Sequence, residues 1–280
     1  MKFFPPCPTF IPLALLGGFF LLVHQALAES SLPDTDIAIG AGVFSKVWLT
    51  GPTRIYSHGA LGDAIEARGV AAEDDHGRVQ EFLLPGDSVF EDRTPRLVST
   101  DEGMAIMLVR SYLDSGAALV LLQVGIDGLK QAAQSQPIGR SFRWLNPIGA
   151  ADLDGDGKTD YAAVITPHIG GILKIYRRSG NRLVEKYAVS GFSNHRLGSR
   201  NLGLSMLADV NADGVKDILV PSANLRTLRL VSFVGGQFNL LKEITLPASI
   251  SGDLRWVNQS LEIPLTGGSV VRIQKSKLLD

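Results

Sequence analysis

The chain has 280 residues, of which 45% are hydrophobic and 20% are charged, and its formal net charge at pH 7 is −1. A chain of this length can bury a large core, and a single all-β domain can use all of it. No basic run is longer than a pair such as Arg177-Arg178. Because nucleic-acid binding needs a concentrated basic face, the composition excludes a nucleic-acid partner from our expectations.

The N-terminal residues have the pattern of a secretory signal. Lys2 precedes an apolar stretch over residues 10–23, and the small-x-small tripeptide Ala26-Leu27-Ala28 follows. The apolar stretch has about 14 residues, whereas a spanning helix needs about 20. We therefore expect a cleaved signal peptide over residues 1–28 and a single periplasmic or secreted domain over residues 29–280. No transmembrane segment is expected after cleavage.

The elements predicted beyond the signal are short strands. The first segment is Ile37–Thr50. Pairs of apolar or alternating runs joined by a glycine-containing turn predict four hairpins. These hairpins span Val70–Leu84, Ala117–Ala133, Ile172–Val189 and Thr227–Leu246. Single apolar runs predict further strands at Met104–Arg110, Tyr161–Thr166, Ile218–Pro221 and Leu261–Leu265. No stretch shows a convincing, capped 3.6-residue period, so the predicted class is all-β.

An aspartate-rich segment occurs twice. Residues 151–160 read ADLDGDGKTD and residues 208–217 read ADVNADGVKD, at an offset of 57 residues. Residues 142–146 (FRWLN) and 254–258 (LRWVN) are similar at an offset of 112 residues, which is two periods of 56. A period of this length with about four short strands per unit is typical of a propeller blade.

The repeat period sets an expected number of blades. Residues 29–280 hold about 4.5 such units, and the last unit stops without its outer hairpin. We therefore expect a β-propeller of about five four-stranded blades. Ile37–Thr50 is expected to supply the missing outer strands of the last blade, because closing the ring removes exposed sheet edges.

Both copies of the loop follow the pattern D-x-[DN]-x-D-G-x-x-D. Positions 1, 3, 5 and 9 carry side-chain oxygens, and the glycine at position 6 permits a sharp turn that aims the next carbonyl inward. The predicted ligands of the first loop are Asp152, Asp154, Asp156, the carbonyl of Lys158, and Asp160. Those of the second are Asp209, Asn211, Asp213, the carbonyl of Val215, and Asp217.

The donor set points to a hard cation. Carboxylates this close repel one another unless a cation lies between them. All the donors are oxygens, with no cysteine or histidine in the pattern, so calcium fits better than zinc or copper. We expect two Ca²⁺ ions, one in each loop.

Two other interpretations of these loops fit the sequence less well. Aspartate and glycine are ordinary residues of solvated turns, but two copies in register, each followed by a strand, count against that reading. A helix–loop–helix EF-hand needs a bidentate glutamate at position 12, where this chain has Ala163 and Val220. Both loops also lead directly into apolar strand-like segments.

The two loops and the strands that follow them resemble FG-GAP/VCBS repeats. These are the calcium-binding blades of integrin α-subunit propellers and of many bacterial exported proteins. The clear repeats cover about residues 140–245. The resemblance implies that the ten positions named above bind calcium on one rim of a propeller. Residues 99–103 look like a shortened loop and residues 252–260 have no acidic cluster, so calcium is expected at the two intact copies.

Other recurring residues leave two readings open. His58 and His195 each occur shortly before a Leu-Gly pair, and they either face a shared central site or bond the backbone at blade junctions. Three arginines recur at one place in successive blades, with a tryptophan beside two of them. These arginines either form a ring that binds an anion or a sugar, or they brace one blade against the next. These residues are Arg143, Arg200, Arg255, Trp144 and Trp256.

No nucleophile elbow, zinc-protease motif, Walker loop or dinucleotide fingerprint is present. We therefore expect an exported, calcium-binding β-propeller that acts as a non-enzymatic binding or structural module for a protein or glycan partner. The alternative is a periplasmic hydrolase or lyase that acts on glycans at the central channel. A deep central pocket with converging His, Asp or Glu side chains would favour the enzyme.

Overall fold

The computed structural model describes Met1 and residues 31–279. The chain divides into the units Met1–Ser30 and Ser31–Asp280, and the predicted signal peptide beyond Met1 lies outside the described residues. The helical elements within residues 31–279 are three 3-10 turns, at Gly42–Phe44, Val234–Gly236 and Lys275–Lys277. The all-β class is therefore confirmed. In this part of the chain no helix has the length and apolar character needed to cross a membrane.

The strands form five consecutive antiparallel groups. The first contains β1 (Ala38–Ile39), β2 (Lys46–Thr53), β3 (Glu66–Glu73) and β4 (Val79–Leu83). After the short strand β5 (Ser88–Phe90), the second contains β6 (Arg96–Thr100), β7 (Gly103–Tyr112), β8 (Gly116–Gly125) and β9 (Gly128–Ser135). The third contains β10 (Leu145–Ala151), β11 (Asp160–Ile165), β12 (Ile172–Ser179) and β13 (Arg182–Ser190).

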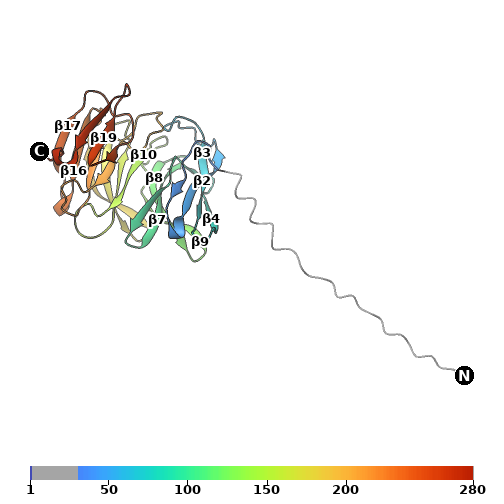
Figure 1. The fold of residues 1–280 in the computed structure, drawn as a ribbon. Coiled ribbons are helices and arrows are strands. Elements are labelled where there is room, and N and C mark those ends of the chain that lie inside the picture. Colours follow the sequence, from blue (N-terminus) through green and yellow to red (C-terminus); the bar gives the residue numbers. More distant parts are fainter. Residues whose placement is uncertain (2–30, 280) are drawn as a thin grey trace. The chain divides into compact units, whose positions relative to one another are not determined.

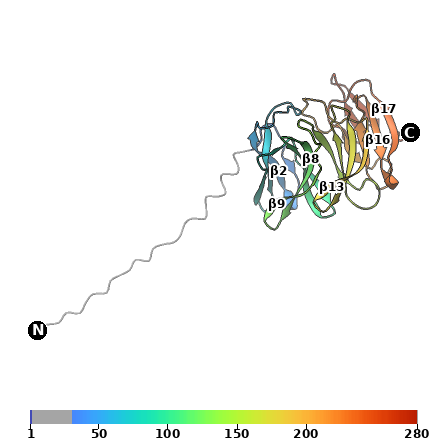
Figure 2. The same ribbon diagram turned by 180° about the vertical axis from the view of Figure 1, so that it is seen from behind.

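The fourth group contains β14 (Met206–Ala208), β15 (Asp217–Pro221), β16 (Thr227–Ser232) and β17 (Asn239–Thr245). The last has three strands, β18 (Arg255–Val257), β19 (Ser260–Pro264) and β20 (Val270–Gln274). Short pairings through β5 and between β9 and β13 join the first three groups into one 13-stranded sheet, and the other two groups are separate sheets. Figures 1 and 2 show the first group (blue) at one end of the domain and the fourth and fifth groups (orange to red) at the other.

The four predicted hairpins are confirmed as β3–β4, β8–β9, β12–β13 and β16–β17. Their turn glycines all have positive φ, from 60° at Gly180 to 113° at Gly128. Glycine reaches this region without the steric cost that a Cβ imposes, which is why these positions can turn the chain. The four predicted single strands correspond to β7, β11, β15 and β19.

Successive groups share buried cores because side chains alternate across each strand. On β7, Ile106 and Leu108 pack toward the first group, whereas Met107 and Val109 pack toward the third. β11 and β15 continue the pattern, so that each group shares an apolar cluster with the next along the chain. Within residues 31–279, no buried cluster combines the first group with the last.

The prediction that Ile37–Thr50 completes the last group is wrong. This segment forms β1 and most of β2, and β2 pairs with β3 in the first group. Val47 and Leu49 lie opposite Ala72 and Val70, and their side chains fill the core shared with the second group. A strand with one buried face pairs where that face meets apolar side chains. Here β2 pairs with β3, and the buried face of β2 packs into the core that the first two groups share. β20 pairs with β19 alone among the described strands.

Candidate metal centre

The first aspartate-rich loop connects β10 to β11 in the third group. Ala151 pairs with Asp160 where the loop begins and ends. Asp152 accepts backbone hydrogen bonds from Gly155 (2.7 Å) and Gly157 (2.8 Å), both of which have positive φ. The loop is therefore a tight turn wound around the Asp152 carboxylate.

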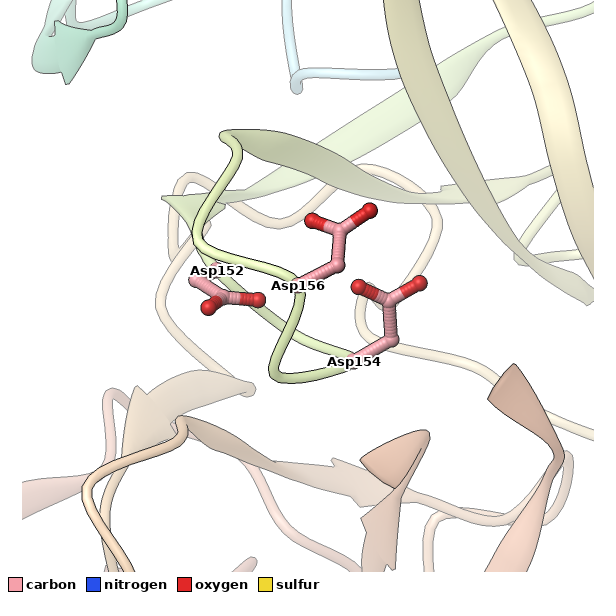
Figure 3. A group of neighbouring side chains, drawn as sticks. All are labelled: Asp152, Asp154 and Asp156. Carbon is pink, nitrogen blue, oxygen red and sulfur yellow. The ribbon is translucent and has the colours of Figure 1, made fainter. Parts of the chain in front are cut away.

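Three carboxylates gather on this loop. One oxygen each of Asp152, Asp154 and Asp156 lies within 4.8 Å of the others. Figure 3 shows the three side chains, with the carboxylates of Asp154 and Asp156 on the same side of the loop. Lys158 donates its backbone N–H to Asp156 at 3.0 Å, and its carbonyl accepts no hydrogen bond from residues 31–279. These donors match the oxygen set that calcium prefers.

Two cations of the chain itself lie against these carboxylates. Arg177, on β12, donates from Nε to Asp160 (2.7 Å) and from Nη1 to Asp156 (2.9 Å). Lys186, on β13, pairs with Asp154, and its Nζ lies 3.7 Å from Asp156 and 3.8 Å from Asp160. Arg177 and Lys186 thus neutralise carboxylates of the first loop from the neighbouring strands, which the loop sequence alone does not reveal.

The pKa values reflect this pairing. Hydrogen bonds from Arg177 hold the pKa of Asp156 well below its ordinary range. Burial raises the pKa of Asp160, and the hydrogen bond and charge of Arg177 oppose that rise. Burial lowers the pKa of Lys186, but the hydrogen bond to Asp154 and the charges of Asp160 and Asp154 together outweigh burial and leave the pKa raised. Both cations therefore remain charged at neutral pH.

The second loop, between β14 and β15, repeats the backbone scaffold of the first. Gly214 donates to Asp209 at 3.1 Å, as Gly157 does to Asp152. Val215 donates to Asp213 at 2.8 Å, and its carbonyl likewise accepts no hydrogen bond within residues 31–279. Val210 donates to Asp217 at 3.1 Å, as Leu153 donates to Asp160 at 3.4 Å in the first loop. The 57-residue repeat is thus a repeat of structure.

The second loop lacks counterparts of Arg177 and Lys186. Ser232 takes the strand position of Arg177, and Leu241 takes the bulge position of Lys186. Among the described residues, no lysine, arginine or histidine forms an ion pair with the carboxylates of this loop. Burial and the charges of its neighbours Asp213 and Asp209 raise the pKa of Asp217, against the backbone hydrogen bond from Val210.

One oxygen of the second loop is left without a partner. Asp209 Oδ1 is buried and makes no hydrogen bond. A buried carboxylate oxygen without a donor is costly, and a bound cation would remove that cost. Asn211 donates its side-chain amide to Asp213 at 2.8 Å and does not reach this oxygen. The three carboxylates of this loop do not meet the 4.8 Å spacing of the first loop's cluster.

The two loops touch each other. Lys216 of the second loop donates its backbone N–H to the carbonyl of Asp152 at 3.3 Å. Thr159 of the first loop donates from its backbone and its hydroxyl to Asp101, at 3.0 and 2.7 Å. Asp101 lies in the shortened loop of the second group. The loops of the second, third and fourth groups therefore form one continuous row, and the two intact aspartate-rich loops are neighbours in it.

The histidines form a separate cluster. His58 Nδ1 lies 2.6 Å from a buried oxygen of Glu91, whose backbone carbonyl accepts a hydrogen bond from Trp144 at 2.9 Å. His168 and His195 hydrogen-bond each other at 2.8 Å. His195 also bonds the carbonyl of Ser199 at 3.0 Å, which confirms the backbone-bonding reading for this histidine. His58 instead bonds a carboxylate.

The recurring arginines do not share one role. Arg200 pairs with Asp34 (3.2 Å) and Asp63 (3.1 Å), and so ties the strand-poor segment before β3 to the linker after the third group. Arg143 donates only to the carbonyl of its neighbour Phe142. Arg255 is exposed and has no side-chain partner within residues 31–279. A common ring of arginines is therefore not formed.

Comparison with known proteins gives no family assignment. No protein-family model matches the chain, and no curated protein sequence matches it. The site must therefore be interpreted from its own geometry.

Proposed function

We propose that the chain is an exported β-propeller of the FG-GAP/VCBS type, with about five blades, that acts as a non-enzymatic binding module for a protein or glycan partner. Five strand groups in one order, with a core shared between each group and the next along the chain, support the propeller. The repeated loop scaffold supports the repeat type. Calcium, on this proposal, stabilises the two aspartate-rich loops of the module.

The second loop is the principal calcium site of this proposal. The observation that carries it is the buried, unpaired Oδ1 of Asp209, in a loop whose carboxylates form no ion pair within residues 31–279. The first loop has more closely spaced carboxylates, but Arg177 and Lys186 already satisfy them. A Ca²⁺ ion there has to displace Lys186, so the first loop binds calcium more weakly than the second.

Calcium is expected to raise the melting temperature of the protein by several degrees over its value in chelator. An ion that binds only the folded chain stabilises it by about 2.7 kcal/mol at a hundred times its dissociation constant. Asp213→Ala is expected to abolish most of this response, and Asp156→Ala to leave most of it. Differential scanning calorimetry with metal analysis measures both. An unchanged melting temperature with no bound ion contradicts the calcium site.

The enzymatic alternative has one observation in its favour. The Glu91 carboxylate orients the His58 imidazole, and no described residue bonds the other ring nitrogen of His58. A carboxylate-oriented imidazole is the arrangement of a general base. Release of reducing ends from neutral and acidic polysaccharides, compared between the native protein and His58→Gln, tests it. Release that requires His58 would replace the binding-module proposal.

A further inference from the structure

Two adjoining hollows lie between the fourth and fifth strand groups. One has a volume of about 480 Å³ and lies between the second aspartate-rich loop and Trp256. The other has a volume of about 520 Å³ and lies beside the β18–β19 turn and the end of β20. Gln259 and Lys275 line both. Together the hollows form one open cleft, which we call the 4–5 cleft.

The walls of the 4–5 cleft carry the groups that bind an acidic sugar. Trp256 is half-buried and forms an aromatic wall, and its indole N–H has no partner among the described residues. Lys216 and Lys275 line the cleft, and neither ammonium group forms an ion pair within residues 31–279. The side chains of Asn258, Gln259 and Gln274 add amide donors and acceptors.

The turn at the edge of the cleft is a two-residue hairpin. Asn258 and Gln259 join β18 to β19, and their φ angles are 46° and 64°. Positive φ at both central residues is what a type I′ hairpin turn requires. The carbonyl of Gln259 accepts a hydrogen bond from the backbone N–H of Lys275 at 2.9 Å, which holds the turn against the end of β20.

The second loop sets the charge of the cleft. Asp209 belongs to that loop and lines the 480 Å³ hollow together with Lys216 and Lys275. Without a cation, the carboxylates of the loop offset the two lysines and repel an anion. A divalent ion in the loop neutralises most of the carboxylate charge and so leaves the lysine charges in excess.

We propose that the 4–5 cleft binds a uronate-containing oligosaccharide, with a sugar ring stacked on Trp256 and its carboxylates paired with Lys216 and Lys275. This rests on the proposed function, because the calcium-loaded second loop makes the cleft cationic. The cleft is open and lined by amides along its length, which suits the hydroxyls of several sugar rings. An acidic peptide needs an apolar pocket for an anchoring side chain, whereas the apolar residues that line the cleft are interspersed with lysine, aspartate and amide side chains.

Isothermal titration calorimetry with three probes tests the ligand class. The probes are a glucuronate-containing hexasaccharide, the same hexasaccharide after carboxyl reduction, and hexaglutamate. In calcium, the acidic hexasaccharide is expected to bind about tenfold more tightly than the reduced one, because each partly exposed ion pair contributes up to about fivefold. Equal binding of the acidic and reduced sugars overturns the proposal, as does tighter binding of hexaglutamate.

Variants of the cleft and a matched control locate the site. Trp256→Ala is expected to weaken acidic-hexasaccharide binding about tenfold, because it removes the aromatic face on which the sugar ring stacks. The double variant Lys216→Ala, Lys275→Ala is expected to bind the acidic and reduced sugars equally. Lys242→Ala, on β17 and outside the cleft lining, is expected to bind as the native protein does. Unchanged binding by both cleft variants, with native melting temperatures, overturns the proposal.

The calcium measurements separate this inference from the proposed function. A calcium-dependent melting temperature without sugar binding means that the 4–5 cleft inference alone is wrong. Sugar binding that depends on Trp256 but is the same in calcium and chelator supports the cleft and overturns its coupling to the loop. A protein that neither responds to calcium nor binds the acidic sugar contradicts both proposals.

Discussion

Arg177→Met is expected to lower the free energy of unfolding by about 3 kcal/mol in chelator, because removal of one partner leaves a buried charge without compensation. Arg177 bridges Asp156 and Asp160, and the Asp160 side chain is fully buried. The same substitution clears part of the space that a divalent ion needs. We therefore expect calcium to restore most of the lost stability, so that the melting temperature of the variant responds to calcium more strongly than that of the native protein.

Two further variants test the reason for this result. Arg182→Met changes an exposed arginine of β13 that has no side-chain partner within residues 31–279, and it is expected to change neither stability nor the calcium response. Leu241→Lys places a cation at the bulge position that Lys186 occupies in the first loop. It is expected to reduce the calcium response of the second loop. An Arg177→Met protein that is destabilised equally with and without calcium would show that the first loop cannot hold an ion.

Glu66→Gln is expected to stabilise the protein at pH 8 by up to about 5 kcal/mol and to change its stability little at pH 4. Glu66 lies on β3 with 2% of its surface exposed. Burial raises its pKa from 4.5 to about 10, and the charges of Glu91, Asp63 and Asp92 add to the rise. Glutamine has nearly the same shape as glutamate and does not ionise, so it removes the cost of keeping this carboxyl group protonated.

The pH dependence follows from proton binding. Between pH 4.5 and about 10, Glu66 is protonated in the folded chain and ionised in the unfolded chain. The folded state then binds one more proton, so stability falls as the pH rises, by about 1.4 kcal/mol per pH unit at most. Below pH 4.5 both states are protonated and the cost disappears. Native and variant proteins should therefore have similar melting temperatures at pH 4 and diverge toward pH 8.

A matched substitution provides the control for Glu66. Asp127 lies in the β8–β9 turn and has no side-chain partner among the described residues. Asp127→Asn removes one negative charge without changing a buried group, and its effect should be small and independent of pH. If Glu66→Gln lowers stability at pH 8, the folded protein contains Glu66 in an ionised form that its surroundings satisfy.

The local sequence predicts much of the fold because its signals are short-range. Apolar runs separated by turn glycines such as Gly77 and Gly180 identify hairpins whose two strands lie within about twenty residues of each other. The aspartate loops are likewise local, and the hydrogen bonds that close them join residues no more than seven positions apart, such as Leu153 and Asp160. The sequence therefore also placed each loop directly before an apolar strand, and the structure has these loops between β10 and β11 and between β14 and β15.

Partners distant in the sequence could not be predicted in the same way. The segment Ile37–Thr50 contains suitable strand residues, but its sequence does not say whether β3 or the last group pairs with it. The apolar faces of Val47 and Leu49 fit the core shared by the first two groups, and that fit selects β3. Trp256 and Asp209 likewise meet at one cleft only because the fourth and fifth groups stack.

The sequence by itself therefore determined the all-β class, the repeat and the ten candidate ligand positions, since each depends on residues close together in the chain. The tertiary structure decided how the two loops differ. Arg177 and Lys186 reach the first loop from β12 and β13, across strand pairing that brings residues 17 to 32 positions apart into contact. At the equivalent positions Ser232 and Leu241 carry no charge, and Asp209 of the second loop keeps a buried oxygen without a partner. Charge compensation acts through space, so two loops with the same pattern acquire different chemistry.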